Sequence, residues 1–419
     1  MRVLFTLPRP LFPTDTGGKI RTLNIFSRLV RRMEIHAVAL AEPGRDDQGA
    51  EEMRRLFAGF TPVHWRETRR FTPAFYAEFA RIRMGRFPYF LGKYHHPGFE
   101  QAARELHHRK PFDLILCDFL HSATAFVGSP LRPRALFQHN LEFRIRRQHW
   151  ETEANPLKKL ILKSEWSKAR AIEEEVCRDF DHVIAVSEED AADHRREFAI
   201  RRVSAIPTGV DVDYFAPQPG PRIPGNIVFV GSFDWYPNED GICWFLREIY
   251  PRIRAEQPAC TATIVGRLPT DGMHRLATSL PGVEVTGAVP DVRPYLARAE
   301  VVVVPLRIGG GTRIKIFEAM AMHRPVVSTT LGAEGLTLRP GHEILLEDSA
   351  EEFARGVVEL LREQPRAAAL ARAARDRVVH EFTWDAVARR MEEILRGIVD
   401  RDRETPQQED PVGAAPLAQ

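Results

Sequence analysis

Cysteine is scarce in this sequence. Four occur among 419 residues, at positions 117, 177, 243 and 260, and no two of them form a Cys-x-x-Cys pair. A small disulfide-held fold and a cysteine-ligated zinc site both need cysteines at short spacing, so both are excluded. We expect buried, reduced thiols.

Long apolar runs and a surplus of charge are also missing. No window approaches the roughly 18 apolar residues of a membrane-spanning helix, and the first apolar run is too short for a signal peptide. Lys and Arg number 59 against 57 Asp and Glu, which argues against a protein that coats nucleic acid. We expect a cytoplasmic protein of two or three domains with no nucleic-acid partner.

Short β-branched runs recur along the chain, each followed by a Gly or Pro turn and a stretch with helical spacing. This alternation is typical of βαβ units around parallel sheets, so we predict an α/β fold. In the first half, strands are expected at 3–7, 36–40, 114–117, 134–138, 183–186 and 203–206. In the second half, they are expected at 227–230, 262–265, 283–286, 301–304, 326–328 and 344–346.

A Pro-rich segment separates the two sets of strands. Residues 207–225 contain five prolines and three glycines, which preclude a helix or a central strand. The predicted organisation is a first domain at 1–206, a linker at 207–225, a second domain at 226–382, a helix at 383–400 that crosses back to the first domain, and a disordered tail at 401–419. Two such domains place the carboxyl ends of both sheets around one cleft, where ligands usually bind.

The most informative segment is VVVVPLRIGGGTRIKIFEAM, which predicts a buried strand, a glycine turn and a helix over 312–323. Bare amides and a positive helix end suit a phosphate, although a glycine triplet alone is equally typical of a flexible turn. On a helical period Gly311, Lys315 and Glu318 share one face. That places a cation and a carboxylate beside the turn, with a surface ion pair as the alternative. Arg313 reaches this turn only if the helix begins later.

By their order and spacing along the chain, several segments resemble those of the glycosyltransferase family 4 type. These are retaining enzymes of the GT-B architecture that use nucleotide-sugar donors. The segments are TDTGGKIRT, AVSEEDA, IPTGVDVDYF, IVFVGSF, ATIVGR, VTGAVPDVRPYLARAEVVVVPL, GGGTRIK and FTWDAVARR. The resemblance implies two Rossmann-like domains that face a cleft, with an N-terminal acceptor domain and a C-terminal donor domain.

The resemblance also implies roles for residues of the second domain. Glu318 matches the second of two family glutamates and would hold the donor ribose, whereas Gly310 stands in place of the first. Ser232 and Asn238 stand where relatives carry Arg and Lys, so we expect Lys315 and Arg313 to supply the cations for the diphosphate. The other expected donor-binding residues are Gly309, Gly310, Gly311, Thr312, Ser232, Arg267 and Gly287.

In the first domain, His139 begins a loop after a predicted strand. The resemblance implies a hydrogen bond to the transferred sugar, with a satisfied polar residue as the alternative. The loop TDTGGKIRT would contact donor phosphate or acceptor, with a helix-capping turn as the alternative. Its candidate residues are Gly17, Gly18, Lys19 and Arg21.

Residues 69–93 combine six basic and seven aromatic side chains with one acidic residue. Such a mixture suits an interface with anionic lipid, and aromatics that pack on the first domain are the alternative. Stacking on nucleic acid is a further possibility for such a mixture. Residues 156–170 have similar character. We therefore expect peripheral contact with the inner face of a membrane.

The predicted activity is transfer of a hexose from a nucleotide diphosphate sugar to a glycan or lipid-linked acceptor with retention, in cell-surface polysaccharide or glycoconjugate synthesis. No metal and no cofactor are expected, because no Asp-x-Asp unit is predicted in a cleft loop, and the Asp-Val-Asp at 211–213 lies in the Pro-rich linker. The alternatives are a nucleotide-sugar 2-epimerase of the same architecture and a non-catalytic nucleotide-binding partner protein.

Overall fold

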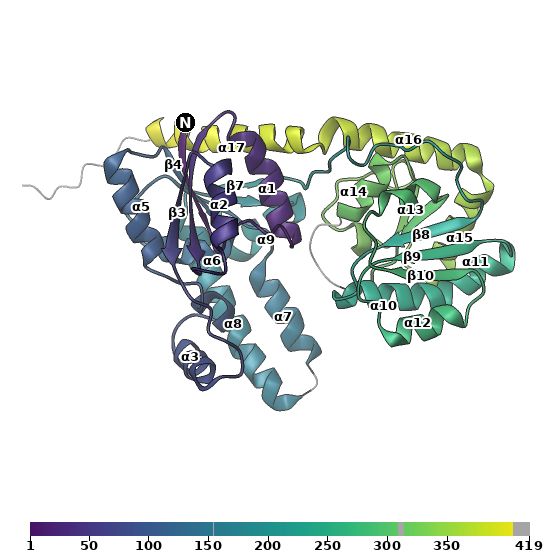
Figure 1. Ribbon diagram of the computed structural model, residues 1–419, viewed down its shortest axis with the longest axis horizontal. Helices are drawn as coiled ribbons and strands as arrows, with labels where there is room; N and C mark the ends of the chain where they lie inside the picture. The colour runs from purple at the N-terminus through teal and green to yellow at the C-terminus, as the bar shows by residue number, and fades with distance from the viewer. Residues whose placement is uncertain (154, 309–313, 405–419) are drawn as a thin grey trace, which may run out of the picture.

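The computed structural model describes residues 1–153, 155–308 and 314–404 (Figure 1). It has two α/β domains, each built on one parallel sheet with helices on both faces. The α/β class and the GT-B arrangement of two Rossmann-like domains are therefore confirmed.

The first sheet has seven parallel strands in the order β3-β2-β1-β4-β5-β6-β7 within the described chain. The central strands β1 and β4 are almost entirely buried, since helices cover both faces of the sheet. The strands are β1 Arg2–Leu7, β2 Glu34–Ala41, β3 Gly59–His64, β4 Leu114–Asp118, β5 Arg134–Phe137, β6 His182–Ala185 and β7 Val203–Ala205.

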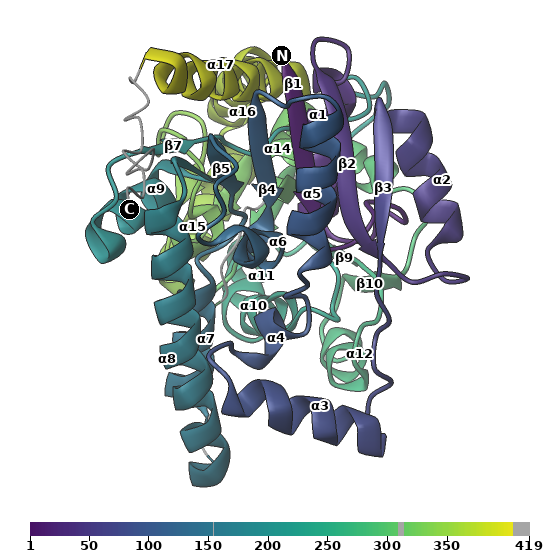
Figure 2. The same cartoon turned by 90° about the vertical axis from the view of Figure 1, so that its left-hand side faces the viewer.

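Helices connect these strands and cover the sheet. Helices α7 and α8 form a long antiparallel pair, and Figure 2 shows α3 and the far end of α8 projecting beyond the carboxyl ends of the strands. The helices are α1 Gly17–Leu29, α2 Asp47–Leu56, α3 Pro73–Met84, α4 Tyr89–Gly92, α5 Gly98–Arg109, α6 Phe119–Ala123, η1 Thr124–Phe126, α7 Glu142–Thr152, α8 Pro156–Asp179 and α9 Glu188–Phe198.

The second sheet has six parallel strands in the order β10-β9-β8-β11-β12-β13 among the described residues. The strands are β8 Asn226–Val230, β9 Thr261–Val265, β10 Val283–Gly287, β11 Val301–Val304, β12 Val326–Ser328 and β13 Leu345–Leu346. The helices are α10 Tyr236–Trp244, η2 Phe245–Ile249, α11 Tyr250–Glu256, α12 Asp271–Thr278, α13 Arg293–Arg298, α14 Ile314–Ala321, η3 Leu331–Ala333, α15 Ala350–Arg362, α16 Gln364–Glu381 and α17 Trp384–Glu404.

Helix α17 leaves the second domain and packs on the first. Its apolar side chains, Trp384, Met391 and Leu395 among them, lie in the same buried cluster as Phe5 and Phe26. Figure 1 shows this helix spanning the top of the first domain beside α1. The last helix is therefore part of the first domain's core.

Three sequence-based boundaries need correction. Strand β3 was not predicted, because Pro62 interrupts it, but a missing N–H is tolerated on an edge strand. The helix expected over 312–323 ends at Ala321, since His323 takes a left-handed conformation with φ 60°. Residues 401–404 are helical, and Arg403 pairs with Asp113 at 2.7 Å. The rest of the expected tail lies outside the described residues.

Candidate functional site

Glycines end two neighbouring strands of the second sheet. Gly231 follows β8 and Gly266 follows β9, and a Cβ built on Gly266 would lie 1.7 Å from the carbonyl oxygen of Gly231. Because no side chain fits there, the position requires glycine. The close approach brings the loops after β8 and β9 together, and these two loops carry the polar groups of the site.

Lys315 reaches from α14 to the loop after β8. Its Nζ donates to Oδ1 of Asn238 at 2.8 Å and lies 4.4 Å from the centroid of the Phe229 ring. Asn238 in turn donates to the carbonyl oxygen of Ser232 at 2.7 Å. The ammonium group therefore stands beside one of the two positions at which the sequence lacks a cation.

Arg267, which follows β9, reaches the other uncharged position. Its Nε donates to Oγ of Ser232 at 2.7 Å and its Nη2 donates to Oδ2 of Asp234 at 2.9 Å. We expected Arg313 to supply this charge, but Arg313 lies outside the described residues. Within the described chain, the cation at Ser232 is Arg267, and it remains 58% exposed.

Glu318 lies on α14 close to Lys315. Burial raises the pKa of Glu318 to about 7, and the Lys315 ammonium partly opposes this rise. The carboxyl group therefore changes charge in the neutral range. A buried acceptor that titrates near neutrality beside a cation is typical of a ligand site.

Part of the predicted donor segment is not described. Gly309, Gly310, Gly311, Thr312 and Arg313 all lie outside the described residues.

Gly287 ends β10 with a left-handed φ of 71°, and its carbonyl oxygen accepts from the Gly266 amide at 3.3 Å. A Cβ on Gly287 would have no atom within 4 Å, so the space beside it is open.

In the first domain, His139 pairs with Asp118 at the carboxyl ends of β5 and β4. The His139 Nε2 lies 2.7 Å from Oδ1 of Asp118, whose Oδ2 accepts from Oγ1 of Thr22 at 3.0 Å. Burial lowers the pKa of His139, and the Asp118 carboxylate opposes this. The imidazole is therefore neutral near pH 7, with its proton on Nε2 and an acceptor lone pair on Nδ1.

Phe119 holds the imidazole from one side. Its ring stacks on His139 with centroids 4.0 Å apart, and its backbone is left-handed with φ 62°. A bulky residue in this conformation stores strain of the kind that collects at functional sites. A Cβ on Gly18 would lie 2.5 Å from the Phe119 ring, so the predicted glycine loop packs directly on this stack.

The other candidates of the glycine loop lie elsewhere. Gly17 begins α1 next to its cap Thr16, and Lys19 contacts the Pro13 carbonyl oxygen and Asp15, each at 3.0 Å. Arg21 is only 3% exposed and donates to the Ile206 carbonyl oxygen. Burial lowers the pKa of Arg21 to about 9. Arg21 thus faces the interior of the first domain, and its expected contact with donor phosphate or acceptor stays a prediction.

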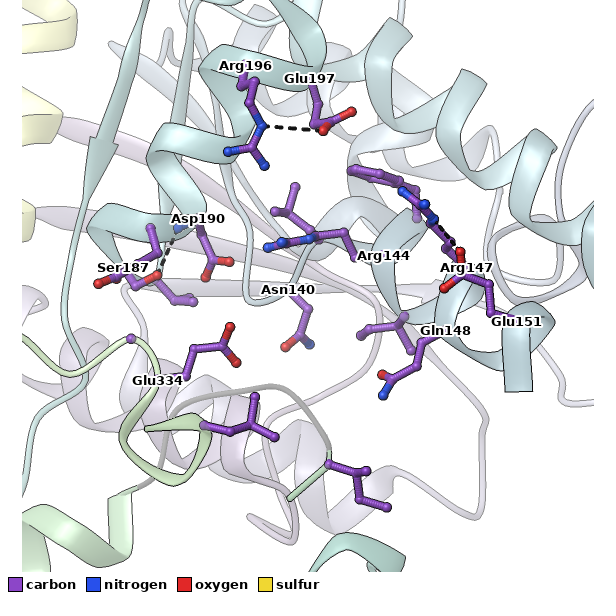
Figure 3. Close-up of a pocket in the computed structure, with 18 of the residues that line it drawn as sticks. Asn140, Arg144, Arg147, Gln148, Glu151, Ser187, Asp190, Arg196, Glu197 and Glu334 are labelled. Atoms are coloured by element: carbon purple, nitrogen blue, oxygen red, sulfur yellow. Dashed lines mark hydrogen bonds and ion pairs between the residues drawn. The ribbon is translucent and has the colours of Figure 1, made fainter. Parts of the chain in front are cut away.

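A cavity of about 590 Å³ lies between the two domains (Figure 3). Helices α7 and α9 supply its wall in the first domain, and the loops after β11 and β12 supply the opposite wall. Figure 3 shows Asn140, Arg144 and Gln148 on one side and Glu334 on the other. Asn140, the residue after His139, lines the cavity, whereas the buried His139 side chain does not.

The cavity is lined by charged groups of both signs. Burial raises the pKa of Asp190, and the negative charges of Asp193 and Glu334 add to this rise. Arg144 bonds to Asp193, and Arg307 pairs with Asp240 at 2.8 Å. Apolar side chains such as Leu141, Ile308 and Leu331 also line the cavity. The lining thus combines apolar surface with many hydrogen-bonding groups, which suits a sugar ligand.

The structure brings several predicted residues together and adds others. Lys315, Glu318, Ser232 and Arg267 gather around the ends of β8 and β9, whereas His139 lies across the cleft in the first domain. The sequence did not single out Asp118, Arg144, Asp190 or Glu334. Asp118 carried a usable signal, because it is a polar residue that ends a buried strand next to the strand before His139.

Across residues 1–153, 155–308 and 314–404, no three His, Cys, Asp or Glu side chains are grouped so as to hold a metal ion. In the same part of the chain, no helix is both long and apolar enough to cross a bilayer.

Two family models match the chain in succession. Residues 16–214 match the model "Glycosyltransferase Family 4", and residues 224–363 match "Glycosyl transferases group 1". The boundary between the two matches falls within the Pro-rich linker.

Individual proteins are similar over part or all of the chain. A GDP-mannose-dependent alpha-(1-6)-phosphatidylinositol monomannoside mannosyltransferase of Mycobacterium tuberculosis is 28% identical over 46% of this chain, which covers 55% of that relative. The chain thus matches about half the length of this relative. Sucrose-phosphate synthase of Thermosynechococcus elongatus has a similar structure, with a TM-score of 0.67, 17% identity, and coverage of 96% and 99% of the two chains. The structure of Anabaena HepE in complex with UDP is also similar, with a TM-score of 0.65 and 14% identity. The match covers 95% of this chain and 100% of HepE.

Proposed function

We propose that this chain, which belongs to the glycosyltransferases whose family models match its two domains, transfers a sugar from a nucleoside diphosphate sugar to an acceptor hydroxyl with retention. The observation that carries the proposal is the Lys315 ammonium beside Asn238, with Arg267 at the neighbouring Ser232. Two cations thus converge where a leaving diphosphate gains negative charge. The structurally similar HepE was solved with UDP, and the mycobacterial relative uses GDP-mannose by its name.

The donor domain would act mainly through electrostatics. Lys315 and Arg267 would neutralise the diphosphate as the bond to the sugar stretches. Glu318 in its ionised form accepts hydrogen bonds from the two ribose hydroxyls. In this proposal protein groups do the work that a divalent metal does in other transferases, and no cofactor takes part.

The first domain would hold the reacting sugar and the acceptor. His139, with its Nε2 proton on Asp118, can accept a hydrogen bond from a sugar hydroxyl through Nδ1. The polar cavity beside Asn140 would bind the acceptor glycan. In a front-face reaction the departing diphosphate oxygen takes the acceptor proton, so retention needs no paired carboxylates at the reacting carbon.

The acceptor we propose is a glycan or glycolipid of a cell-surface polysaccharide or glycoconjugate. The mycobacterial relative acts on a phosphatidylinositol monomannoside by its name. A lipid-linked acceptor would bring the protein to the cytoplasmic face of a membrane as a peripheral protein.

The test is turnover of UDP- and GDP-linked hexoses with and without an extract of lipid-linked glycans. We expect release of nucleoside diphosphate only with acceptor, and an NMR coupling constant in the product that matches the donor anomer. Lys315→Gln should abolish turnover, whereas Arg275→Gln, an exposed cation of α12, should leave it unchanged. Epimer formation without acceptor, or no turnover with any donor, would contradict the proposal.

A further inference from the structure

Large apolar side chains are exposed on two segments of the first domain that lie far apart in sequence. The exposed fractions are 81% for Phe71, 57% for Tyr76, 84% for Met84, 75% for Leu157, 68% for Leu160 and 39% for Ile161. We call residues 69–84 together with 155–163 the tip. Figure 2 shows that α3 and the far end of α8 form the lower end of the first domain.

The two segments of the tip are fastened to one another. Arg83 pairs with Glu165 of α8 at 3.5 Å, and Lys168 donates to the carbonyl oxygen of Gly85 at 2.7 Å. Leu157 and Ile161 precede Glu165 by two turns and one turn, so they lie on the helix face that α3 adjoins. The exposed side chains of both segments therefore belong to one surface.

Packing on the first domain accounts for only some of the aromatic side chains of residues 69–93. Phe75 and Phe79 contact Tyr89, with the Phe79 and Tyr89 centroids 5.0 Å apart, and Phe87 stacks on His95 at 4.3 Å. Residues 85–93 thus pack on the domain. Phe71 and Tyr76 remain exposed, so the packing alternative leaves them unexplained.

The tip is strongly basic. It contains seven Lys and Arg side chains and one acidic residue, Glu78. Arg69, Arg70, Arg81, Lys158 and Lys163 are exposed, and the described part of the chain gives none of them a carboxylate partner. By contrast, Arg83 and Arg86 pair with Glu165 and Glu175. Exposed apolar groups among unpaired cations are complementary to a surface with negative headgroups and an apolar interior.

We propose that the tip is a docking surface for an anionic lipid bilayer. Leu157, Leu160, Met84 and Tyr76 enter the headgroup region, and the unpaired cations contact lipid phosphates. The inference rests on the proposed function, because it places the acceptor of that reaction in a lipid bilayer.

The position of the tip relative to the cavity fits this role. Helix α7 ends at the tip and lines the cavity through Arg144, Arg147, Gln148 and Glu151. It has 11 residues and is therefore roughly 16 Å long. Trp150 stacks on Trp166 at 4.9 Å and holds this end of α7 against α8. A headgroup glycan of a few sugars could thus extend along α7 from the bilayer to the cavity.

The test is co-sedimentation of the full chain with vesicles of phosphatidylcholine, with and without phosphatidylglycerol, at two salt concentrations. The charge variant is Arg81→Gln with Lys158→Gln, and its control is Arg31→Gln with Arg109→Gln, two exposed cations that precede the amino ends of β2 and β4. The apolar variant is Leu157→Ser with Leu160→Ser, and its control is Ile223→Ser in the linker.

We expect the wild type and both controls to bind anionic vesicles, and less at high salt. The charge variant should bind about thirtyfold more weakly, since each cation near an anionic leaflet contributes a factor of about five. Equal binding of variants and controls, or indifference to lipid charge, would overturn the inference. Donor turnover with detergent-solubilised acceptor and no vesicles separates the two proposals. A chain that turns over donor under these conditions but does not bind vesicles supports the proposed function and contradicts the docking role of the tip. Unchanged thermal unfolding shows that each variant is folded.

Discussion

At the scale of single residues, the account depends on how neighbours set the protonation of a few side chains. Asp118 is fully buried and accepts from both His139 and Thr22. It does not touch the cavity itself. Its effect is to hold the proton of His139 on Nε2 and so to present Nδ1 as an acceptor, which makes Asp118 a positioning residue.

We therefore expect Asp118→Asn to lower kcat by roughly ten- to a hundredfold, since it removes a charge-assisted hydrogen bond that orients the imidazole. Donor KM should change less than about twofold. Steady-state kinetics with saturating donor measures both. In a His139→Ala background the same substitution should cost almost nothing. Equal additional losses in both backgrounds would show that Asp118 acts only on folding.

The raised pKa of Glu318 predicts that donor binding depends on pH. Its pKa is raised to about 7, so the carboxyl group is protonated below that pH and loses acceptor capacity for the ribose hydroxyls. Affinity for UDP-glucose or GDP-mannose should fall roughly tenfold from pH 8 to pH 6. A nucleotide sugar is the right probe, because it has no terminal phosphate. The terminal phosphate of a nucleoside diphosphate titrates near pH 6 and would add its own pH dependence.

The matched variant is Glu318→Gln, which should bind donor about as weakly at pH 8 as the wild type does at pH 6. Calorimetry at both pH values gives the comparison. A wild type whose affinity is flat across this range would contradict the assignment.

At this scale the sequence could predict which side chains share a helix face, whereas the roles of the site residues stay predictions. Lys315 and Glu318 follow from one helical face, so their neighbourhood could be predicted. Asp118 and Glu334 could not be paired with their partners, because those contacts join segments remote in sequence. The burial of Arg21 could not be predicted either, since nothing in the sequence shows which face of α1 packs on the sheet.

At the scale of elements, Glu173 fixes the start of α7. Its buried carboxyl group accepts from the amides of Glu142 at 2.9 Å and Phe143 at 2.7 Å, and also from the side chain of Gln138. These are the unpaired donors of a helix amino end and of the residue next to His139. Burial raises the pKa of Glu173 to about 8, and these amide donors lower it in part. The cap thus sets the direction in which α7 runs along the cavity.

Glu173→Ala should lower the free energy of unfolding by about 2–4 kcal/mol, because it leaves buried donors without an acceptor. Urea unfolding followed by circular dichroism provides the number. Glu174→Ala is the matched control one residue later: its carboxylate pairs with the exposed Arg178 at 2.7 Å, which is worth less than about 1 kcal/mol. Similar losses in the two variants would refute the capping role.

Most elements could be predicted from the sequence. The buried parallel strands read as β-branched runs between turns, so twelve of the described strands were expected and β3 was missed. Pro62 hid that strand, and only its place at the sheet edge explains why proline is tolerated. The projection of α3 with α8 was not predictable, because it depends on ion pairs between residues 83 and 165.

At the scale of the whole molecule, the two domains carry different sets of polar side chains on opposite sides of one cleft. The second domain collects Lys315, Arg267 and Glu318, and the first domain carries the Asp118–His139 pair and most of the cavity wall. Helix α17 joins the two by completing the first domain's core. In the proposed function, this arrangement would place a charged donor site opposite a hydroxyl-binding acceptor site, with the reacting bond between them.

The measurement that tests this account most directly is calorimetric titration of UDP and GDP, and of uridine and guanosine, into the wild type and Lys315→Gln. If the Lys315 ammonium binds the diphosphate, the dissociation constant for the diphosphates rises roughly ten- to a hundredfold, while that for the nucleosides stays within about twofold. Arg275→Gln should match the wild type for every ligand. Equal losses for diphosphates and nucleosides, or no loss for either, would contradict the placement of the donor site.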